Sequence, residues 1–584
     1  MANKMSLKPF LKKIRRSHLI IFLLVSFLVF LSYYLIFNNA ILDETMLYSW
    51  AWILNYLDKT LFYILLVVIV VISYIIARIR FKLKEKHFLI FIFLLAFILS
   101  SATWNLASPN PDVAEFFGVA KYVELHGPIE YFKDFGTSEL RGYRFHTLPF
   151  LLGLLFRYFG ESYTLSNIIL STMFAFIPVL TFLLSRRLFD RKVASISAFF
   201  ILSIPFLLIQ SSMLLVDVSV VFFVLLSLLT FYTFLKSRNP WYYPLTIITF
   251  FLAIFSKRPA ILFLLITLPL IFLFVKKRED INFKILSYKT FMLLYILFVV
   301  VFIFVFLKFD FFSQQLALDA SQANIIGEPD SYENPLSFLF QIQPLIIILF
   351  LTSIMFLFVN RKLSLLFLTA WFVFPYIFLY ETTLRYMMPA FPAIAIGAAY
   401  VLSRFKKPII TFTVTMIFLS STLAFATGYL PLMKNEFYDT NILETARYVD
   451  GLEGVSSVGV YIFYEQLEYV ESPKTEIYGY VFDHYSDKRV YYYVSESVNK
   501  VYNLGFSRFK IFDYYKDNNY WNPDYDAIVV FSDVVDFQDI VASDVDHIIP
   551  TLDEDYVLEK TYSLGKSGIE PNSYGFIYLR KDLH

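Results

Sequence analysis

Apolar runs long enough to cross a lipid bilayer recur from residue 18 to residue 427, and they limit this chain to folds whose solvent is a membrane. A helix needs about 20 mostly apolar residues to span the hydrocarbon layer. Hydrophobic residues make up 58% of the chain, whereas soluble domains contain roughly 45 to 50%. About 13 spans are predicted, at 18–37, 60–77, 87–106, 165–184, 193–212, 218–235, 242–255, 260–275, 290–307, 338–359, 363–380, 386–402 and 409–427. The sequence therefore predicts a polytopic α-helical membrane protein.

Lys and Arg cluster at every second predicted loop, which sets the expected orientation because these residues resist translocation. With a cytoplasmic N-terminus, the cytoplasmic loops contain the basic groups at 78–82, 186–192, 236–238, 276–278, 361–362 and 404–407. The loops 107–163 and 310–336 and the C-terminal region are then extracytoplasmic. The first apolar run is long and has no small-residue cleavage site, so we expect an uncleaved span rather than a signal peptide. The apolar segment 145–158 is predicted to lie at the outer interface.

The C-terminal region differs in charge from the rest of the chain. From Tyr429 onward the chain contains 13 Lys and Arg and 27 Asp and Glu, so the net charge of this region is −14. The preceding residues have a net charge of +16. Strand-like runs at 458–464, 489–495, 526–532 and 574–580 alternate with helix-like stretches at 441–452 and 495–505. We expect a soluble extracytoplasmic α/β domain over 429–584, in which the many tyrosines are ordinary strand residues rather than a glycan surface. The membrane part divides into an N-terminal tail with two accessory helices, 1–86, and a main domain, 87–428.

Three basic residues lie on the side predicted to be extracytoplasmic and so break the charge pattern. Lys257 and Arg258 stand between two spans in the sequence FSKRPA, and Arg385 precedes a span in LRYMMPAFPA. For each residue alone, a side chain snorkelling at a helix end is the alternative. Together they favour an anion site at the outer leaflet, because Arg contacts phosphate through two nitrogens and Lys adds a compact charge. A lipid phosphate is the expected anion.

Carboxylates are predicted on the same side. Asp112, in SPNPDVAEFFGVAKY, is expected to cap an amphipathic helix, and Glu115 three residues later shares its face. Asp217 interrupts the apolar run SSMLLVDVSVVFF, where a carboxylate is costly unless it faces protein or water. Helix capping by Asp112 and pairing of Asp217 with a neighbouring helix are the structural alternatives to a role in chemistry.

The order of several short motifs resembles one family of membrane enzymes. A span is followed by PDVAEFFGVAKY, a helix ending in FRYFG, and spans ending in SRRLFDRK and SSMLLVD, and then by FSKRPA and LRYMMPAFPA. This arrangement resembles the GT-C glycosyltransferases that use polyprenyl-phosphate sugars, a branch that includes the protein O-mannosyltransferases and the aminoarabinose transferase of lipid A. The resemblance covers residues 87 to 405, and it implies a catalytic role for the main membrane domain.

The resemblance assigns roles to four residues. Asp112 matches the Asp of the family's first external loop and Asp217 the acid of the second, while Lys257 and Arg385 match the basic residues of two external turns. Two positions depart from the family pattern. A second acid commonly follows the first Asp, but Val113 stands there, and Arg258 replaces the usual Gly after the Lys. These departures affect the acceptor and any metal contact more than the donor site.

The implied reaction transfers a sugar, with inversion, from a polyprenyl- or dolichyl-phosphate donor to an acceptor hydroxyl on a protein, lipid or glycan. Asp112 would be the general base and Asp217 would orient the acceptor or the base. The donor phosphate would be held by Lys257, Arg258 and Arg385. The sugar and acceptor site is expected to include Glu115, Tyr143, Arg144, His146 and Tyr386, with interfacial anchoring as the alternative for the residues of the 143–146 segment.

A metal cofactor stays unassigned at this stage. Oxygen or nitrogen ligands for a divalent metal are available at Glu115, Asp134, His146 and Asp217, but no spacing forms a compact metal motif. The chain has no Gly-rich phosphate loop and no feature of a nucleic-acid partner. Two other functions remain open: an oligosaccharide ligase or polymerase with a lipid-diphosphate donor, and a transporter, although paired half-repeats with broken helices are not evident.

Overall fold

The structure of the protein, a computed structural model, describes most of the predicted membrane part and the strands of the C-terminal region. The described residues are 16–39, 57–79, 83–106, 111–134, 147–237 except 212 and 214, 241–279 except 258, 342–379, 384–435, 438–463, 482, 485–486, 488–492, 525–532, 552, 554–564 and 573–584. The predicted span at 290–307 and the predicted helix at 495–505 lie outside these residues.

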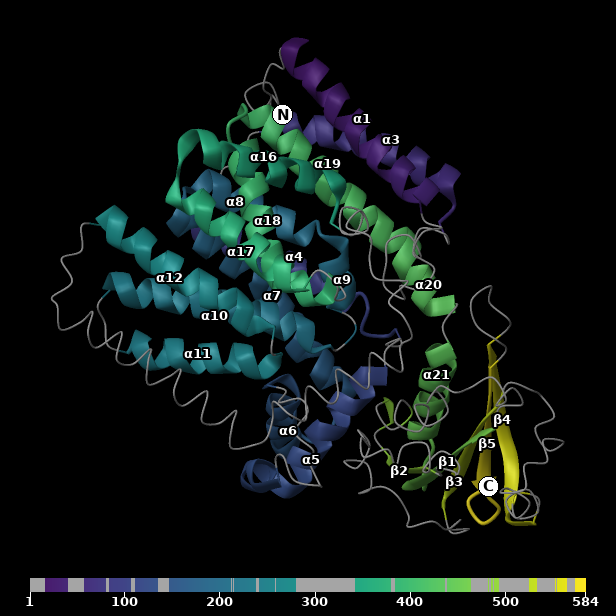
Figure 1. Ribbon diagram of the computed structural model, residues 1–584. Helices are drawn as coiled ribbons and strands as arrows, with labels where there is room; N and C mark the ends of the chain where they lie inside the picture. The colour runs from purple at the N-terminus through teal and green to yellow at the C-terminus, as the bar shows by residue number, and fades with distance from the viewer. Residues whose placement is uncertain are drawn as a thin grey trace, which may run out of the picture.

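Helices form a bundle, and a smaller sheet lies beside one end of it (Figure 1). The first helices are α1 (Arg16–Asn39), α3 (Lys59–Arg78), α4 (Glu85–Ser101), α5 (Pro111–Asp134), α6 (Thr147–Phe159), α7 (Tyr163–Leu188), α8 (Arg191–Leu202), α9 (Pro205–Gln210), α10 (Val216–Ser237), α11 (Tyr242–Ser256) and α12 (Ala260–Glu279). The later helices are α16 (Pro344–Asn360), α17 (Leu363–Leu379), the 3-10 helix η3 (Leu384–Ala390), α18 (Phe391–Leu402), α19 (Lys407–Ala424), the π-helix η4 (Phe425–Tyr429), α20 (Leu430–Asn435) and α21 (Tyr438–Asp450).

The outer surface of the bundle is apolar, as a lipid environment requires. On α1 the exposed fractions of Ile20, Leu23 and Phe27 are 69%, 63% and 61%, whereas soluble proteins rarely expose contiguous apolar surface of this kind. Within the described residues, 7 helices are long and apolar enough to cross a membrane. Four shorter apolar helices of 10–17 residues accompany them. The protein is thus a multi-span membrane protein, and the total of about 13 spans stays a prediction.

The predicted span at 193–212 is wrong as a single helix. The structure breaks it into α8 and α9 at Ser203 and Ile204. Pro205 is the physical reason, because it has no N–H to donate to the preceding turn and its ring favours the first position of a new helix. Both pieces are buried inside the bundle, so the sequence is apolar on either side of the break. Hydropathy therefore did not indicate where the helix ends.

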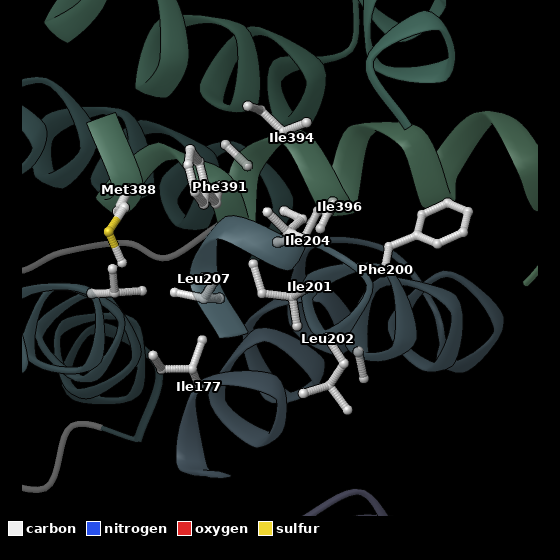
Figure 2. Packing of buried hydrophobic residues seen from close by; sticks show 14 of the residues in the cluster. Ile177, Phe200, Ile201, Leu202, Ile204, Leu207, Met388, Phe391, Ile394 and Ile396 are labelled. Carbon is white, nitrogen blue, oxygen red and sulfur yellow. The ribbon is translucent and has the colours of Figure 1, made fainter. Parts of the chain in front are cut away.

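Helix α18 packs against this broken segment. Figure 2 shows Phe391 and Ile396 facing residues of α8 and α9, among them Ile201 and Leu207, whereas Ile394 lies on the opposite side of α18. All five side chains are almost completely buried, and close packing of this kind fixes the rotation of a helix. The core therefore holds the turn that precedes α18, where Arg385 lies.

The C-terminal region contains a mixed five-stranded sheet. Its strands are β1 (Ser457–Phe463), β2 (Arg489–Tyr492), β3 (Ala527–Ser532), β4 (Tyr556–Leu564) and β5 (Ser573–Arg580), in the spatial order β2-β1-β3-β5-β4. β1 is parallel to β2 and β3, whereas β5 is antiparallel to β3 and β4. β3 is buried on both faces, which explains its continuous apolar sequence. The four predicted strands and the helix predicted at 441–452 are confirmed.

Strand β4 was not predicted from the sequence. Glu559 and Lys560 interrupt its alternation of apolar and polar residues, and the register shifts between Leu558 and Lys560. Such charges and irregularities are typical of edge strands, because they prevent pairing with another chain. The Lys560 Nζ atom lies 4.1 Å from the centre of the Tyr448 ring on α21, so the edge strand is attached to the helix beside it.

Asp526 fastens β1 to β3 and makes the sheet sensitive to acid. Its carboxylate accepts hydrogen bonds from the backbone N–H groups and hydroxyls of Ser456 and Ser457 at 2.7 to 3.1 Å. Partial burial raises the pKa of Asp526, but these four hydrogen bonds outweigh burial and hold the pKa below its ordinary value of 3.8. The charged carboxylate therefore stabilises the folded sheet above about pH 4, and this stabilisation is lost as the pH falls through the folded-state pKa.

We expect Asp526→Asn to destabilise the sheet by roughly 1 to 3 kcal/mol at neutral pH, because charge-assisted hydrogen bonds are lost. Hydrogen exchange of the β1 and β3 amides, corrected for intrinsic rates, measures this difference. It should shrink below about pH 4. Asp582→Asn is the matched control, since the Asp582 side chain is 64% exposed and bonds only on the surface to Arg580. Equal effects of both substitutions would contradict this assignment.

Candidate functional site

A buried ion pair joins two of the residues singled out in the sequence. The Lys257 Nζ atom donates a hydrogen bond to the Asp217 Oδ1 atom at 2.6 Å, and the exposed fractions of the two side chains are 16% and 2%. The second carboxylate oxygen of Asp217 is buried and has no hydrogen-bond partner among the described residues. A buried carboxylate with an unused oxygen is costly unless a further donor binds there. Within the described part of the chain, the pair thus keeps one buried acceptor oxygen unused.

The turn that presents Lys257 follows from its sequence. α11 ends at Ser256, and Lys257 has extended backbone with φ −166° and ψ 135°. Pro259 two residues later lacks an N–H group and disfavours helical backbone in the residue before it, so the helix cannot continue. α12 then starts at Ala260, which leaves Lys257 at the end of a tight helical hairpin.

Arg385 and Tyr386 come to the same place from another helix. The Tyr386 ring lies 4.0 Å from Lys257 Nζ and 5.9 Å from Arg385 Cζ, measured to the ring centre. An aromatic face attracts cations and can hold two of them near one another. Both residues belong to η3, which contacts α10, the helix of Asp217. The structure therefore brings together four of the predicted site residues: Asp217, Lys257, Arg385 and Tyr386.

This cluster lies at the end of the bundle that faces the C-terminal sheet. The Arg187 guanidinium near the end of α7 donates to the Thr233 hydroxyl in α10. Asp217 lies 16 residues before Thr233, which is about 24 Å along a helix axis. The two helices are therefore parallel, and Asp217 lies toward the start of α7. There the ring centre of Tyr163 is 5.4 Å from that of Tyr485 in the C-terminal region.

The predicted residues of the first external loop are only partly described. Asp112 and Glu115 lie in the first turns of α5, but their side chains are outside the described atoms, as are Arg258 and the segment 143–146. α5 begins at Pro111, so Asp112 is the second residue of the helix and lies two residues after the N-cap, the position that was expected for it. Thr147, which follows the 143–146 segment, donates to the Leu252 carbonyl on α11 at 2.8 Å. That contact attaches the end of the loop to the helix that leads to Lys257.

One buried charge pair was missed in the sequence. On α5 the Lys121 Nζ atom lies 2.6 Å from Glu161 Oε1, and the Lys121 side chain is only 3% exposed. Lys121 stands four residues after the buried Phe117, so its place on the apolar helix face was the available signal. Burial also raises the pKa of nearby Glu124, against the lowering effect of the Lys121 charge. This pair fastens α5 to the connection between α6 and α7.

A metal site is not evident in the part of the chain that the structure describes. No three His, Cys, Asp or Glu side chains come together there as a metal-binding group. Of the four residues considered as ligands, Asp217 is engaged with Lys257. The side chains of Glu115, Asp134 and His146 are outside the described atoms.

The chain is similar in sequence or in fold to several known proteins. The sequence model of the dolichyl-phosphate-mannose-protein mannosyltransferase family matches residues 147–305, which include Asp217 and Lys257. The crystal structure of ArnT from Cupriavidus metallidurans bound to undecaprenyl phosphate is similar with a TM-score of 0.52 at 10% identity, covering 84% of this chain and 98% of that one. The oligosaccharyltransferase AglB from Archaeoglobus fulgidus, in complex with an inhibitory peptide and a dolichol-phosphate, has a TM-score of 0.42 at 11% identity, with 77% and 70% covered. The search of curated protein sequences returned no match.

The fold and the comparisons define the class of this protein. It is a multi-span helical membrane protein whose fold is similar to that of ArnT, with a small C-terminal sheet. The resemblance of its sequence to GT-C glycosyltransferases is confirmed, by the mannosyltransferase family model over residues 147–305 and by the fold of ArnT over most of the chain.

Proposed function

We propose that the protein is a membrane glycosyltransferase that moves a sugar from a polyprenyl- or dolichyl-phosphate donor to an acceptor hydroxyl on the extracytoplasmic side. One observation carries the proposal: the cations of Lys257 and Arg385 meet at the Tyr386 ring beside the buried Asp217. Two cations at the rim of a membrane bundle fit a lipid phosphate. The similar ArnT structure is bound to undecaprenyl phosphate, which supports this donor class.

In this proposal the basic residues bind the donor phosphate and stabilise it as it leaves. Lys257, Arg258 and Arg385 offset the charge that develops on the phosphate when its bond to the sugar breaks. Asp217 positions Lys257, since the Lys257 Nζ and Asp217 Oδ1 atoms are 2.6 Å apart. These groups supply the positive charge that the leaving phosphate needs, so no step requires a divalent cation.

The acceptor is activated by Asp112. Its carboxylate removes the proton of the acceptor hydroxyl, whose oxygen attacks the anomeric carbon from the face opposite the phosphate, and the lipid phosphate departs with the electrons of the broken bond. This geometry inverts the anomeric centre. Glu115, Tyr386 and the 143–146 segment, which contains Tyr143, Arg144 and His146, contact the sugar and the acceptor. The contact of Thr147 with α11 supports this placement of the loop.

The proposal also covers the organisation and orientation of the chain. We assign 1–86 to the N-terminal tail and accessory helices, 87–428 to the catalytic membrane domain and 429–584 to the soluble domain. The N-terminus is cytoplasmic, because the basic loops alternate in that sense. The contact between Tyr163 and Tyr485 supports placing the soluble domain and the candidate site at the same face of the membrane.

Donor binding tests the proposal before any acceptor is known. Purified protein in nanodiscs is titrated with undecaprenyl phosphate, dolichyl phosphate and undecaprenyl diphosphate. We expect the monophosphates to bind and Arg385→Ala to weaken them about 10- to 100-fold, because a guanidinium contact with phosphate is lost. Arg447→Ala, on the exposed surface of α21, is the control and should leave affinity unchanged. Tighter binding of the diphosphate would favour the ligase or polymerase, and equal affinity of Arg385→Ala and wild type would contradict the phosphate site.

A further inference from the structure

A second polar site lies at the other end of the bundle. A cavity of about 690 Å³ opens between the connection from α7 to α8, the last turns of α12 and α18, and the start of α17. One of its lining residues, Leu188, ends α7 directly after Arg187. Because Arg187 contacts Thr233, the cavity lies at the end of α10 opposite to Asp217. By the predicted orientation this end is cytoplasmic.

The lining of this cavity is strongly basic. Its cations come from four separate segments and are Lys192, Lys277, Arg361, Lys362 and Arg404. Against these five cations stands one carboxylate, Asp190, which already accepts a hydrogen bond from the backbone N–H of Val193 at 2.9 Å. Among the described residues, no ion pair neutralises any of the five. Like charges gathered around one cavity repel one another, and a bound anion would relieve this.

Tyr400 contacts two of these cations. Its ring centre lies 4.6 Å from Arg404 Cζ and 5.6 Å from Lys362 Nζ, and it packs at 5.2 Å against the Phe189 ring. Lys192 donates to the backbone carbonyls of the turn after α18, at 3.2 Å in one case. Three of the five exposed basic side chains, those of Lys192, Lys362 and Arg404, are thus positioned by packing or hydrogen bonds.

Further features of the cavity suit an anion, and one of them suits an anion that carries a hydrocarbon chain. Leu363 and Ser364, the first residues of α17, line the cavity, so the positive end of that helix faces it. Arg361, just before α17, has left-handed backbone with φ 46°. L-residues rarely adopt this conformation. Leu188 and Phe274 provide an apolar wall on the α7 and α12 side. Charge and apolar surface therefore meet in one cavity of ligand size.

We propose that this cavity binds a phosphate-bearing anion, the chemistry shared by a phospholipid headgroup and free inorganic phosphate. Membrane topology alone accounts for Lys and Arg on this side, because cytoplasmic loops are enriched in them. Topology does not require basic residues of four segments to converge on one cavity with a single acid. The site is separate from the proposed donor site and does not depend on the transferase activity.

Binding by the purified full-length protein in detergent tests this inference. Native mass spectrometry is used to titrate a short-chain phosphatidylglycerol, with phosphatidylcholine as the zwitterionic comparison and inorganic phosphate as competitor. We expect saturable binding of phosphatidylglycerol and a loss of affinity of about tenfold or more in Arg361→Gln/Lys362→Gln. Lys277→Gln, on a different helix, should weaken binding in the same direction. This single variant shows whether the loss of binding in the double variant comes from a local folding defect.

Lys84→Gln/Lys86→Gln is the matched control, because it removes two cations at the same end of the bundle, where Glu85 lies within 4.0 Å of Arg186 and Arg191. The control should change affinity less than about twofold. Competition by millimolar phosphate would identify a free-phosphate site, and its absence would identify a lipid headgroup site. Equal effects of the cavity and control variants, or no saturable binding of either phosphate compound, would overturn the proposal.

Discussion

Lys257→Met is expected to abolish sugar transfer and to destabilise the membrane domain by about 3 to 5 kcal/mol. The substitution leaves the carboxylate of Asp217, which is 2% exposed, buried without its cation. It also removes a positive charge that we assign to the donor phosphate. Thermal unfolding of the protein in detergent measures the first effect, and transfer from a polyprenyl-phosphate sugar measures the second.

The double variant Asp217→Asn/Lys257→Met separates these two effects. Removing both charges should restore most of the stability, because replacing a buried ion pair by neutral residues is often neutral. Transfer should stay at least 10²-fold below wild type, since the phosphate still lacks Lys257. Lys86→Met, on the exposed surface of α4, is the control for the loss of a lysine. Transfer at the wild-type rate by the double variant would show that Lys257 has only a structural role.

Asp112→Asn is expected to lower the rate of transfer by about 10² to 10⁴, the usual contribution of a general base. The amide keeps the size of the side chain but cannot accept the proton of the acceptor hydroxyl. Binding of the donor lipid should be unchanged, because the phosphate contacts lie on other helices. Single-turnover kinetics with bound donor measure the chemical step apart from binding.

Glu130→Gln is the matched control for this variant. Glu130 lies on the same helix, beyond the break at Gly127, where φ is 84°. A neutral amide there should leave transfer within about twofold of wild type, as expected for a substitution away from the reacting groups. A normal rate in Asp112→Asn would remove Asp112 from the role of base, and an equal loss in both variants would point to a general defect of α5.

The sequence predicted the fold best where one physical effect dominates. The spans α1, α3, α7 and α10 could be predicted because their apolarity is continuous and the bilayer sets their length. The break before α9 could not be predicted from apolarity alone, because Pro205 acts inside a run whose residues are all buried. β4 escaped prediction for the opposite reason, since its edge position tolerates charges that erase the strand pattern.

The candidate site shows a different limit. Membrane spans rarely contain an acid, and basic residues concentrate in cytoplasmic loops. Asp217 departs from the first pattern, and Lys257 and Arg385 depart from the second. Such departures can be detected in the sequence without a structure. The sequence could not predict that these three side chains lie close together. The alternation of spans predicts only that the start of α10 and the end of α11 lie on one side of the membrane. The packing of three helices brings the Lys257 side chain to Asp217 and places the Tyr386 ring beside Lys257.

The most direct measurement of the central claim is sugar transfer by the purified wild-type protein in lipid, with a panel of radiolabelled polyprenyl- and dolichyl-phosphate sugars as donors and a membrane extract as acceptor. We predict that at least one monophosphate donor gives labelled product, and that Asp112→Asn and Lys257→Met lower the rate of its formation by at least about 10²-fold. A protein that binds none of the donor lipids and transfers none of the sugars would contradict the assignment as a lipid-phosphate-dependent glycosyltransferase.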